Sequence, residues 1–187
     1  MLLSKKFRAN YISKKLLEKY IDDGSKVIDI GAGDCILTET LKDVKSLDII
    51  AVDKENYSET DITPIVYDGM KLPFDDEYFD CANIIFVLHY VKNREELLGE
   101  AVRVARKKII IISDIYSGYL GGKWARIWGY LANTSRSYDH KSGFAISEKE
   151  LDKIISDLEL KIQDQKSFRM MSSCYLQKHK LVVLEKQ

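Results

Sequence analysis

The chain has 187 residues, enough for one domain with a substantial core and too few for two ordinary domains. Its 29 lysine and arginine residues balance 29 aspartate and glutamate residues, which excludes a sequence-wide basic surface for nucleic acid. Three widely spaced cysteines without a CxxC pair argue against a disulfide framework and a zinc knuckle. No stretch approaches the roughly 18 apolar residues of a membrane span, so we expect a soluble cytoplasmic protein.

The first elements combine a helix with a strand and a glycine turn. Apolar residues at helical spacing predict an amphipathic helix over residues 10–22. Residues 26–35, KVIDIGAGDC, read as a buried strand, a turn containing Gly31 and Gly33, and the start of a helix that Asp34 can cap. A strand that enters a glycine turn and a helix N-terminus is typical of a nucleotide-binding site.

The remaining elements predict an α/β fold. Apolar runs separated by helical patterns indicate a parallel sheet that is covered on both faces. Ser147 and Glu150 form a capping box that opens a helix through Leu158. The other expected elements are strands at 47–52, 65–67, 79–87 and 109–112, a helix at 93–105, a loosely held helix at 116–133, and two antiparallel strands at 160–168 and 179–185.

Three acids follow the first three predicted strands. Asp53 lies about twenty residues beyond the glycine turn, where a carboxylate can accept hydrogen bonds from both ribose hydroxyls. Asp68 can accept from an adenine amino group, and Asp29 precedes the turn. Because the carboxyl ends of parallel strands meet at one edge, we expect these acids to converge on one crevice.

The charge of this crevice discriminates between nucleotides. A pyrophosphate favours positive potential, whereas a sulfonium with an ammonium group favours carboxylates. The last glycine of the dinucleotide fingerprint is replaced by Ile36, and the chain has no room for a separate substrate domain. An NAD-dependent dehydrogenase is therefore disfavoured.

Longer motifs carry a resemblance to a known family. DIGAGDC, AVDKEN, YDGMKLPF with FDCANIIFVLHYV, and the later E..RV resemble the class I S-adenosylmethionine-dependent methyltransferases, in particular the small-molecule branch called type 11, over residues 20–115. The resemblance implies a Rossmann-like, doubly wound seven-stranded sheet in the order 3-2-1-4-5-7-6, with strand 7 antiparallel. We expect one methyltransferase domain over residues 1–187, with residues 115–146 inserted as a cap over the substrate.

The resemblance also implies a cofactor site for S-adenosylmethionine. Acids and glycines after strands one to three would hold the methionine part, the ribose and the adenine in turn. The implied residues are Asp29, Gly31, Gly33, Asp53, Lys54, Asp68, Gly69 and Met70. The chain departs from the family pattern at Cys35, where a third glycine is frequent, and at residues 106–108, where Arg-Lys-Lys replaces a proline and two glycines.

Methyl transfer requires alignment, exclusion of water and, for some acceptors, removal of a proton. We expect metal-independent chemistry, because no cluster of metal ligands is readable from the sequence. His89 follows strand four and is either a general base or substrate contact, or a histidine bonded to the backbone. The candidate catalytic residues are His89, Tyr116 and His140, with Asp114 and Tyr138 in the same region.

The sequence does not identify the methyl acceptor. Aromatic residues in the segment 115–146 suit a pocket for a small molecule, and no membrane partner is expected. An RNA methyltransferase that stacks bases on these aromatics is an alternative. A non-catalytic subunit that binds S-adenosylmethionine for a partner is another.

Overall fold

The computed structural model describes residues 2–116, 146–172 and 175–186. The first helix, α1 (Leu2–Ile12), continues into a short π-helical segment, η1 (Ser13–Leu17). The elements that follow are β1 (Lys26–Ile30), α2 (Ile36–Lys45), β2 (Asp48–Asp53), β3 (Ile65–Val66), β4 (Phe79–Ile85), the 3-10 turn η2 (Leu88–Tyr90), α3 (Arg94–Val104), β5 (Ala105–Tyr116), β6 (Ile146–Ser147), α5 (Glu148–Asp157), β7 (Lys161–Ser172) and β8 (Tyr175–Glu185).

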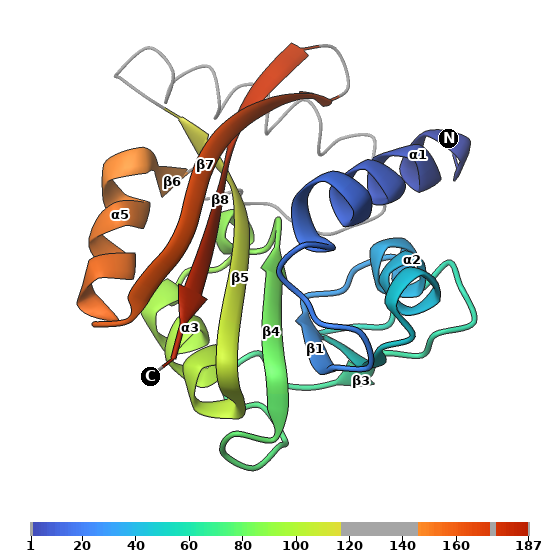
Figure 1. The fold of residues 1–187 in the computed structure, drawn as a ribbon, viewed down its shortest axis with the longest axis horizontal. Coiled ribbons are helices and arrows are strands. Elements are labelled where there is room, and N and C mark those ends of the chain that lie inside the picture. Colours follow the sequence, from blue (N-terminus) through green and yellow to red (C-terminus); the bar gives the residue numbers. More distant parts are fainter. Residues whose placement is uncertain (1, 117–145, 173–174, 187) are drawn as a thin grey trace.

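The strands form one sheet in the order β3-β2-β1-β4-β5-β8-β7, and the short β6 pairs with the end of β5 (Figure 1). Strands β1 to β5 are mutually parallel, whereas β8 runs antiparallel to both β5 and β7. The short strand β6 was not predicted, so the predicted strands 6 and 7 correspond to β7 and β8 of the structure. The predicted order and the antiparallel strand are confirmed.

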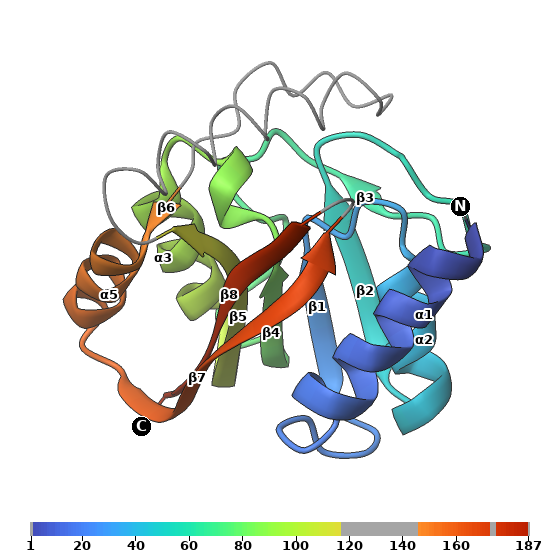
Figure 2. The same ribbon diagram turned by 90° about the horizontal axis from the view of Figure 1, so that it is seen from above.

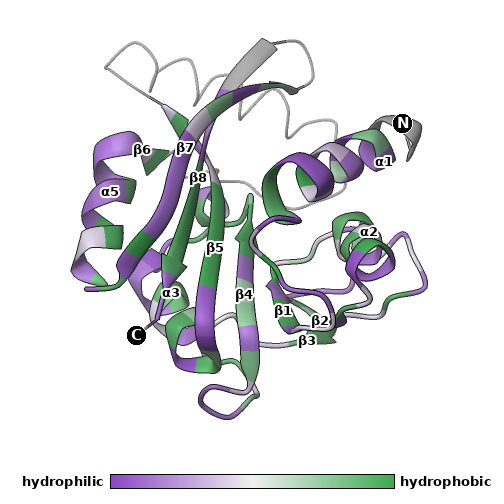
Figure 3. Ribbon diagram, viewed as in Figure 1, coloured by the Kyte–Doolittle hydropathy of each residue, from purple (hydrophilic) through white to green (hydrophobic). Residues whose placement is uncertain are grey.

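Helices cover both faces of this sheet (Figure 2). The face covered by α3 and α5 buries Ile109 and Ile111 of β5, and the face covered by η1 and α2 buries Ile110 and Ile112. Successive side chains of a strand point to opposite faces, so four consecutive isoleucines suit a strand buried on both sides. Figure 3 shows the middle of β5 as hydrophobic.

The first helix differs from the prediction. Helical structure runs from Leu2 to Leu17, whereas the periodicity predicted residues 10–22. Helical periodicity reports a buried face, and residues 5–8 of α1 contain no buried side chain, with Phe7 76% exposed. Tyr20 and Ile21 are buried as the pattern indicated, although they lie beyond the helix.

The junction before β5 explains one departure from the family pattern. Helix α3 ends at Val104 and β5 begins at the next residue, so no loop separates them. Arg106 and Lys107 instead pair with Asp80 of β4, with nitrogen-to-oxygen distances of 2.7 and 2.9 Å. The junction is therefore held by ion pairs across two neighbouring strands.

The N-cap of α5 by Ser147 is confirmed, because Ser147 Oγ accepts a hydrogen bond from Glu150 N at 3.1 Å. The carboxylate of Glu150, which would complete a capping box, pairs with Arg94. The predicted helix over 116–133 and most of the predicted cap over 115–146 lie outside the described residues. Within the described part, Cys35 and Cys81 are buried free thiols. No helix among the described residues combines the length and apolar character needed to cross a membrane.

Candidate cofactor and acceptor site

The glycine turn after β1 is a place of close approach. Gly31 has φ +76° and donates its N–H to Val52 O at 2.8 Å. A Cβ at Gly31 would come within 2.5 Å of Val87 Cγ2, on the segment after β4. Glycine is therefore required both by the backbone conformation and by the contact between the ends of β1 and β4.

Cys35 occupies the end of this turn in a conformation that favours glycine. It is the N-cap of α2, has φ +58° and is fully buried. The predicted cap by Asp34 takes the form of a hydrogen bond from Ile36 N to Asp34 Oδ1 at 3.3 Å. Burial and nearby carboxylates raise the pKa of the Cys35 thiol to about 11, so the thiol is protonated at neutral pH.

Asp53 joins the turn after β1 to the end of β2. Its Oδ2 accepts from Gly33 N at 2.8 Å, and its Oδ1 accepts from Lys54 N at 2.6 Å. A carboxylate has about four acceptor positions, so two remain for a ligand. The two backbone donors fix the direction in which those positions point.

Asp29 lies beneath the turn and is 3% exposed. Its Oδ2 accepts from Thr38 Oγ1 of α2 at 2.5 Å. Burial, with a further contribution from the charges of Asp53 and Asp34, raises the pKa of Asp29 to about 6. Ionised Asp29 is therefore energetically unfavourable in the folded protein, and a cationic ligand would offset this unfavourable free energy.

The loop after β3 contains the predicted adenine site. Asp68 Oδ1 accepts from Met70 N at 2.8 Å and from Lys71 N at 3.3 Å, which forms a tight turn. Gly69 has φ +80°, and a Cβ there would come within 1.9 Å of Lys54 Cε. The structure therefore brings Lys54 and Gly69 together, with Met70 66% exposed beside them.

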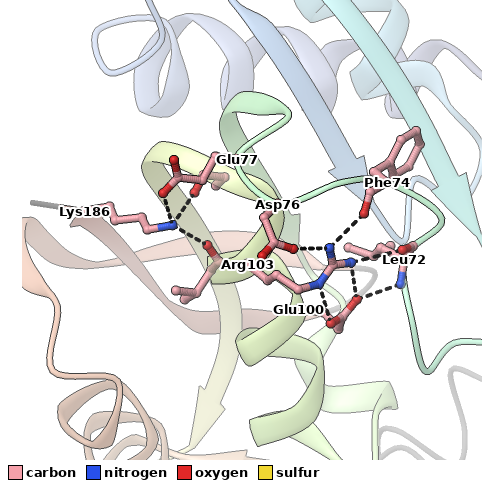
Figure 4. Close-up of polar contacts among 9 residues, drawn as sticks. Leu72, Phe74, Asp76, Glu77, Glu100, Arg103 and Lys186 are labelled. Atoms are coloured by element: carbon pink, nitrogen blue, oxygen red, sulfur yellow. Dashed lines mark hydrogen bonds and ion pairs between the residues drawn. The ribbon is translucent and has the colours of Figure 1, made fainter.

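An ion-pair network on α3 holds the chain that leaves this loop (Figure 4). Glu100 Oε2 accepts from Leu72 N at 2.8 Å and also pairs with Arg103. Arg103 in turn donates to the carbonyls of Leu72 and Phe74 and to Asp76. The E..RV motif thus ties α3 to the LPF motif in this chain.

The acceptor side contains two histidines around one acid. Asp114 lies near the end of β5. Its Oδ1 is hydrogen-bonded to His179 Nδ1 at 2.7 Å, and its Oδ2 lies 3.8 Å from His89 Nε2. Burial lowers the pKa of His89, and Asp114 only partly opposes this effect. Burial alone would raise the pKa of Asp114, but the hydrogen bond with His179 and the nearby histidines lower it overall, so this acid is ionised at neutral pH.

His179 is the residue of this cluster that the sequence reasoning missed. The sequence pattern predicts only that it lies in a terminal strand. The register of β5 and β8, which places His179 opposite Asp114, is what reveals its role in the cluster. Tyr116 is the last described residue of β5, and His140 and Tyr138 lie outside the described residues. In the described part of the chain, no group of three histidine, cysteine or acidic side chains is arranged to hold a metal ion.

Comparisons with known proteins agree with this fold. Residues 28–112 match the type 11 family model described as "Methyltransferase domain". A search of curated protein sequences gave no significant match. Residues 28–112 are therefore similar to the type 11 methyltransferase family, and the chain has the class I methyltransferase fold.

Solved structures share this fold at low sequence identity. A Thermotoga maritima protein described as a "SAM-dependent methyltransferase, possible histamine N-methyltransferase" has a TM-score of 0.66 at 18% identity, covering 99% of this chain and 95% of its own. A Haloferax volcanii "putative methyltransferase" bound to the Trm112 activator has a TM-score of 0.71 at 18% identity, covering 97% and 92%. The [4+2]-cyclase SpnF has a TM-score of 0.71 at 11% identity, covering 97% and 80%.

The cofactor implied by the family is S-adenosylmethionine. The residues fit this group, because Asp29, Asp53 and Asp68 lie at or just after the carboxyl ends of the parallel strands β1, β2 and β3, which meet at this edge. A cation suits an edge at which Asp29 is held next to other carboxylates. The SpnF comparison shows that the fold alone does not decide the reaction.

Proposed function

We propose that the protein is a methyltransferase that transfers the methyl group of S-adenosylmethionine to a small-molecule acceptor by in-line displacement, without a metal. The observation that carries the proposal is the series of acids behind a glycine turn, in which Gly33 and Lys54 fix the carboxylate of Asp53. When bound, the cofactor supplies a methyl group on a good leaving group. The protein aligns the acceptor, excludes water and takes up a proton where one is released.

The proposed cofactor contacts follow the three loops. Asp29, Gly31 and Gly33 face the methionine part, Asp53 with Lys54 the ribose, and the loop of Asp68, Gly69 and Met70 the adenine. Each would act through its carboxylate, its backbone or, for Met70, its apolar surface. His89, Tyr116 and His140 are the proposed acceptor-side residues, and residues 115–146 form the proposed acceptor cap.

Calorimetry with S-adenosylhomocysteine tests the assignment. We expect binding by the wild type and a loss of about tenfold or more for Asp53→Ala, because a hydrogen bond to a charged group contributes about 1.5–3 kcal/mol. Asp48→Ala is the matched control, since Asp48 is an exposed acid at the opposite end of the same strand. No binding by the wild type, or equal binding by Asp53→Ala, would overturn the proposal.

The acceptor class is tested by supplying radiolabelled S-adenosylmethionine to a cell extract and separating small molecules, RNA and protein. Label in the small-molecule fraction supports the proposal. The Thermotoga structure, described as a possible histamine N-methyltransferase, is consistent with such an acceptor. Label that is retained after addition of a chelator supports transfer without a metal, and loss of label with the chelator contradicts that part.

A second candidate is a protein that acts on RNA or together with a partner subunit. The Haloferax structure favours it, because that methyltransferase is bound to an activator protein. Label in RNA would replace the first candidate, as would salt-sensitive retention on total RNA that neutralising Lys123, Arg126 and Arg136 removes. Label in no fraction, with retained S-adenosylhomocysteine binding, would indicate a non-catalytic subunit.

A further inference from the structure

The cluster of His89, Asp114 and His179 is built at the acceptor side of the site. His89 follows β4 in η2, Asp114 lies two residues before the end of β5, and His179 is a buried residue of β8. The two histidines face different oxygens of the Asp114 carboxylate: His89 Nε2 faces Oδ2, and His179 Nδ1 faces Oδ1. Residues that are far apart in the sequence therefore share one negative charge.

Two nitrogens of this cluster are left over. His89 Nδ1 and His179 Nε2 are buried and have no hydrogen-bond partner among the described residues. Leaving a buried polar atom unpaired costs about 1–3 kcal/mol, which is unusual in a histidine kept only for packing. Such atoms are common where a ligand completes the hydrogen bonds.

The surroundings assign different roles to the two histidines. His179 is 2% exposed and lies between the rings of Phe86 and Phe168, at centroid distances of 5.3 and 5.2 Å. The side chain of His89 is 12% exposed. Val87, two residues before His89, touches the position of Gly31 in the cofactor turn. His89 is thus the histidine nearer to the reacting groups.

We propose that His89 accepts the proton of the methyl acceptor, and that Asp114 and His179 are positioning residues that fix its tautomer and stabilise its charged form. The negative charge of Asp114, 3.8 Å from His89 Nε2, favours the tautomer with the proton on that nitrogen, which leaves Nδ1 with a free lone pair. His89 then carries its proton on Nε2, facing Asp114, and presents Nδ1 as the base. This inference rests on the proposed function and narrows it to acceptors that lose a proton.

The proton balance defines that acceptor class. The acceptor atom forms a bond to the methyl carbon, the methyl–sulfur bond breaks with its electron pair left on sulfur, and the acceptor proton moves to His89 Nδ1. Water then takes the proton from His89. Hydroxyl, phenol, thiol and primary or secondary amine acceptors fit this step, whereas a tertiary amine or a thioether has no proton to lose.

The charges that face His89 come from four elements. Asp114 of β5 favours its protonated form, while Arg8 of α1, Arg94 of α3 and His179 of β8 oppose it. With burial, these groups keep His89 neutral at pH 7, as a base must be. Removing the charge of Asp114 should therefore lower the pKa of His89 further.

Nuclear magnetic resonance of histidine-labelled protein tests the arrangement, because the chain has only three histidines. The full chain is titrated with saturating S-adenosylhomocysteine. We expect His89 to be neutral at pH 7 with the proton on Nε2, and its pKa to fall by at least about 0.5 unit in Asp114→Asn. Asp152→Asn is the control, because Asp152 pairs with Lys180, the neighbour of His179, and should leave His89 unchanged.

Methyl transfer into the labelled extract is the second measurement. His89→Ala and Asp114→Asn should each lower the rate by about 100-fold or more. His179→Asn keeps an N–H donor toward Asp114 and should retain more activity than His179→Phe, which has none.

An unchanged pKa of His89 in Asp114→Asn, or full activity of His89→Ala, would overturn the inference. If the wild type does not bind S-adenosylhomocysteine, the proposed function fails instead. If it binds and the pKa of His89 does not depend on Asp114, the proposed function stands and only the positioning role of Asp114 fails. Asp114→Asn keeps the shape of the side chain, so the test does not depend on whether His179→Phe folds.

Discussion

The two ends of the central strands both hold buried or partly buried acids, but in opposite environments. At the amino end of β4, Asp80 accepts from Lys26 N at 3.0 Å and pairs with Arg106 and Lys107. Burial alone would raise the pKa of Asp80, but these partners lower it well below its ordinary range. At the carboxyl end of β1, burial and neighbouring acids raise the pKa of Asp29 to about 6.

The difference separates an acid whose charge is balanced within the fold from an acid whose charge is not balanced there. Asp80 has its counter-charges within the protein, so its ionised form stabilises the folded state. Asp29 is next to acids and accepts from a neutral hydroxyl, so its ionised form destabilises the folded state until a cation is bound. Substitutions at the two ends should therefore have opposite effects on stability.

Asp29→Asn should have the largest effect. The folded pKa of Asp29 lies above its unfolded value, so stability is lost as pH rises from about 4 through 6. We expect the asparagine variant to be up to about 3 kcal/mol more stable at pH 7.5, and similar to the wild type near pH 4. Denaturant unfolding at both pH values measures this, and a less stable variant at pH 7.5 would contradict it.

The same variant should bind S-adenosylhomocysteine more weakly. Thr38 can reverse its hydroxyl and donate to or accept from the new amide, so the local packing is retained. Unchanged affinity together with increased stability would show that Asp29 has no part in binding.

Asp80→Asn should act in the opposite direction. The folded pKa of Asp80 lies below its unfolded value, so its stabilising effect is present above about pH 4 and is lost as pH falls below that value. We expect a loss of about 1–3 kcal/mol at pH 7.5, with unchanged affinity for S-adenosylhomocysteine. Asp48→Asn, at the same edge but exposed, is the control for a general charge effect.

Arg103→Lys tests the network that connects α3 to the chain leaving the loop after β3. Lysine cannot reproduce the fork that contacts Glu100, Asp76 and two carbonyls. We expect a loss of stability of about 1–2 kcal/mol and a weakening of S-adenosylhomocysteine binding smaller than that of Asp53→Ala. Arg106→Lys, at a site where the side chain is 52% exposed, should change binding in neither direction.

Cys35 should show the smallest effect. Glycine at this position relieves a left-handed conformation that costs a side chain about 1–2 kcal/mol, but it removes a fully buried thiol. The two changes oppose each other, so Cys35→Gly should alter the unfolding free energy by less than about 1 kcal/mol. Cys35→Val, branched at a positive φ, should be clearly less stable, and equal stability would contradict this account of the turn.

Much of the candidate site follows from local patterns. The strand before Gly31, the offset of Asp53 and the acid Asp68 after a short strand are all readable, because a parallel sheet gathers the ends of its strands at one edge. The capping of α5 by Ser147 is equally local, since one side chain and one backbone N–H decide it. The start of α1 was not predicted, because its exposed residues leave no periodic signal.

The sequence by itself determined the central strands and the acids at their carboxyl ends, since hydrophobic period and residue offset are properties of neighbouring positions. The order of the strands in the sheet was implied by the family resemblance. Only the tertiary structure decided that burial and neighbouring acids disfavour the ionised form of Asp29, whereas partners within the fold favour the ionised form of Asp80. It also decided that His179 faces Asp114, because the register of two antiparallel strands depends on packing across 65 residues of chain. Burial and charge at a site are sums over elements distant in sequence, so no local pattern contains them.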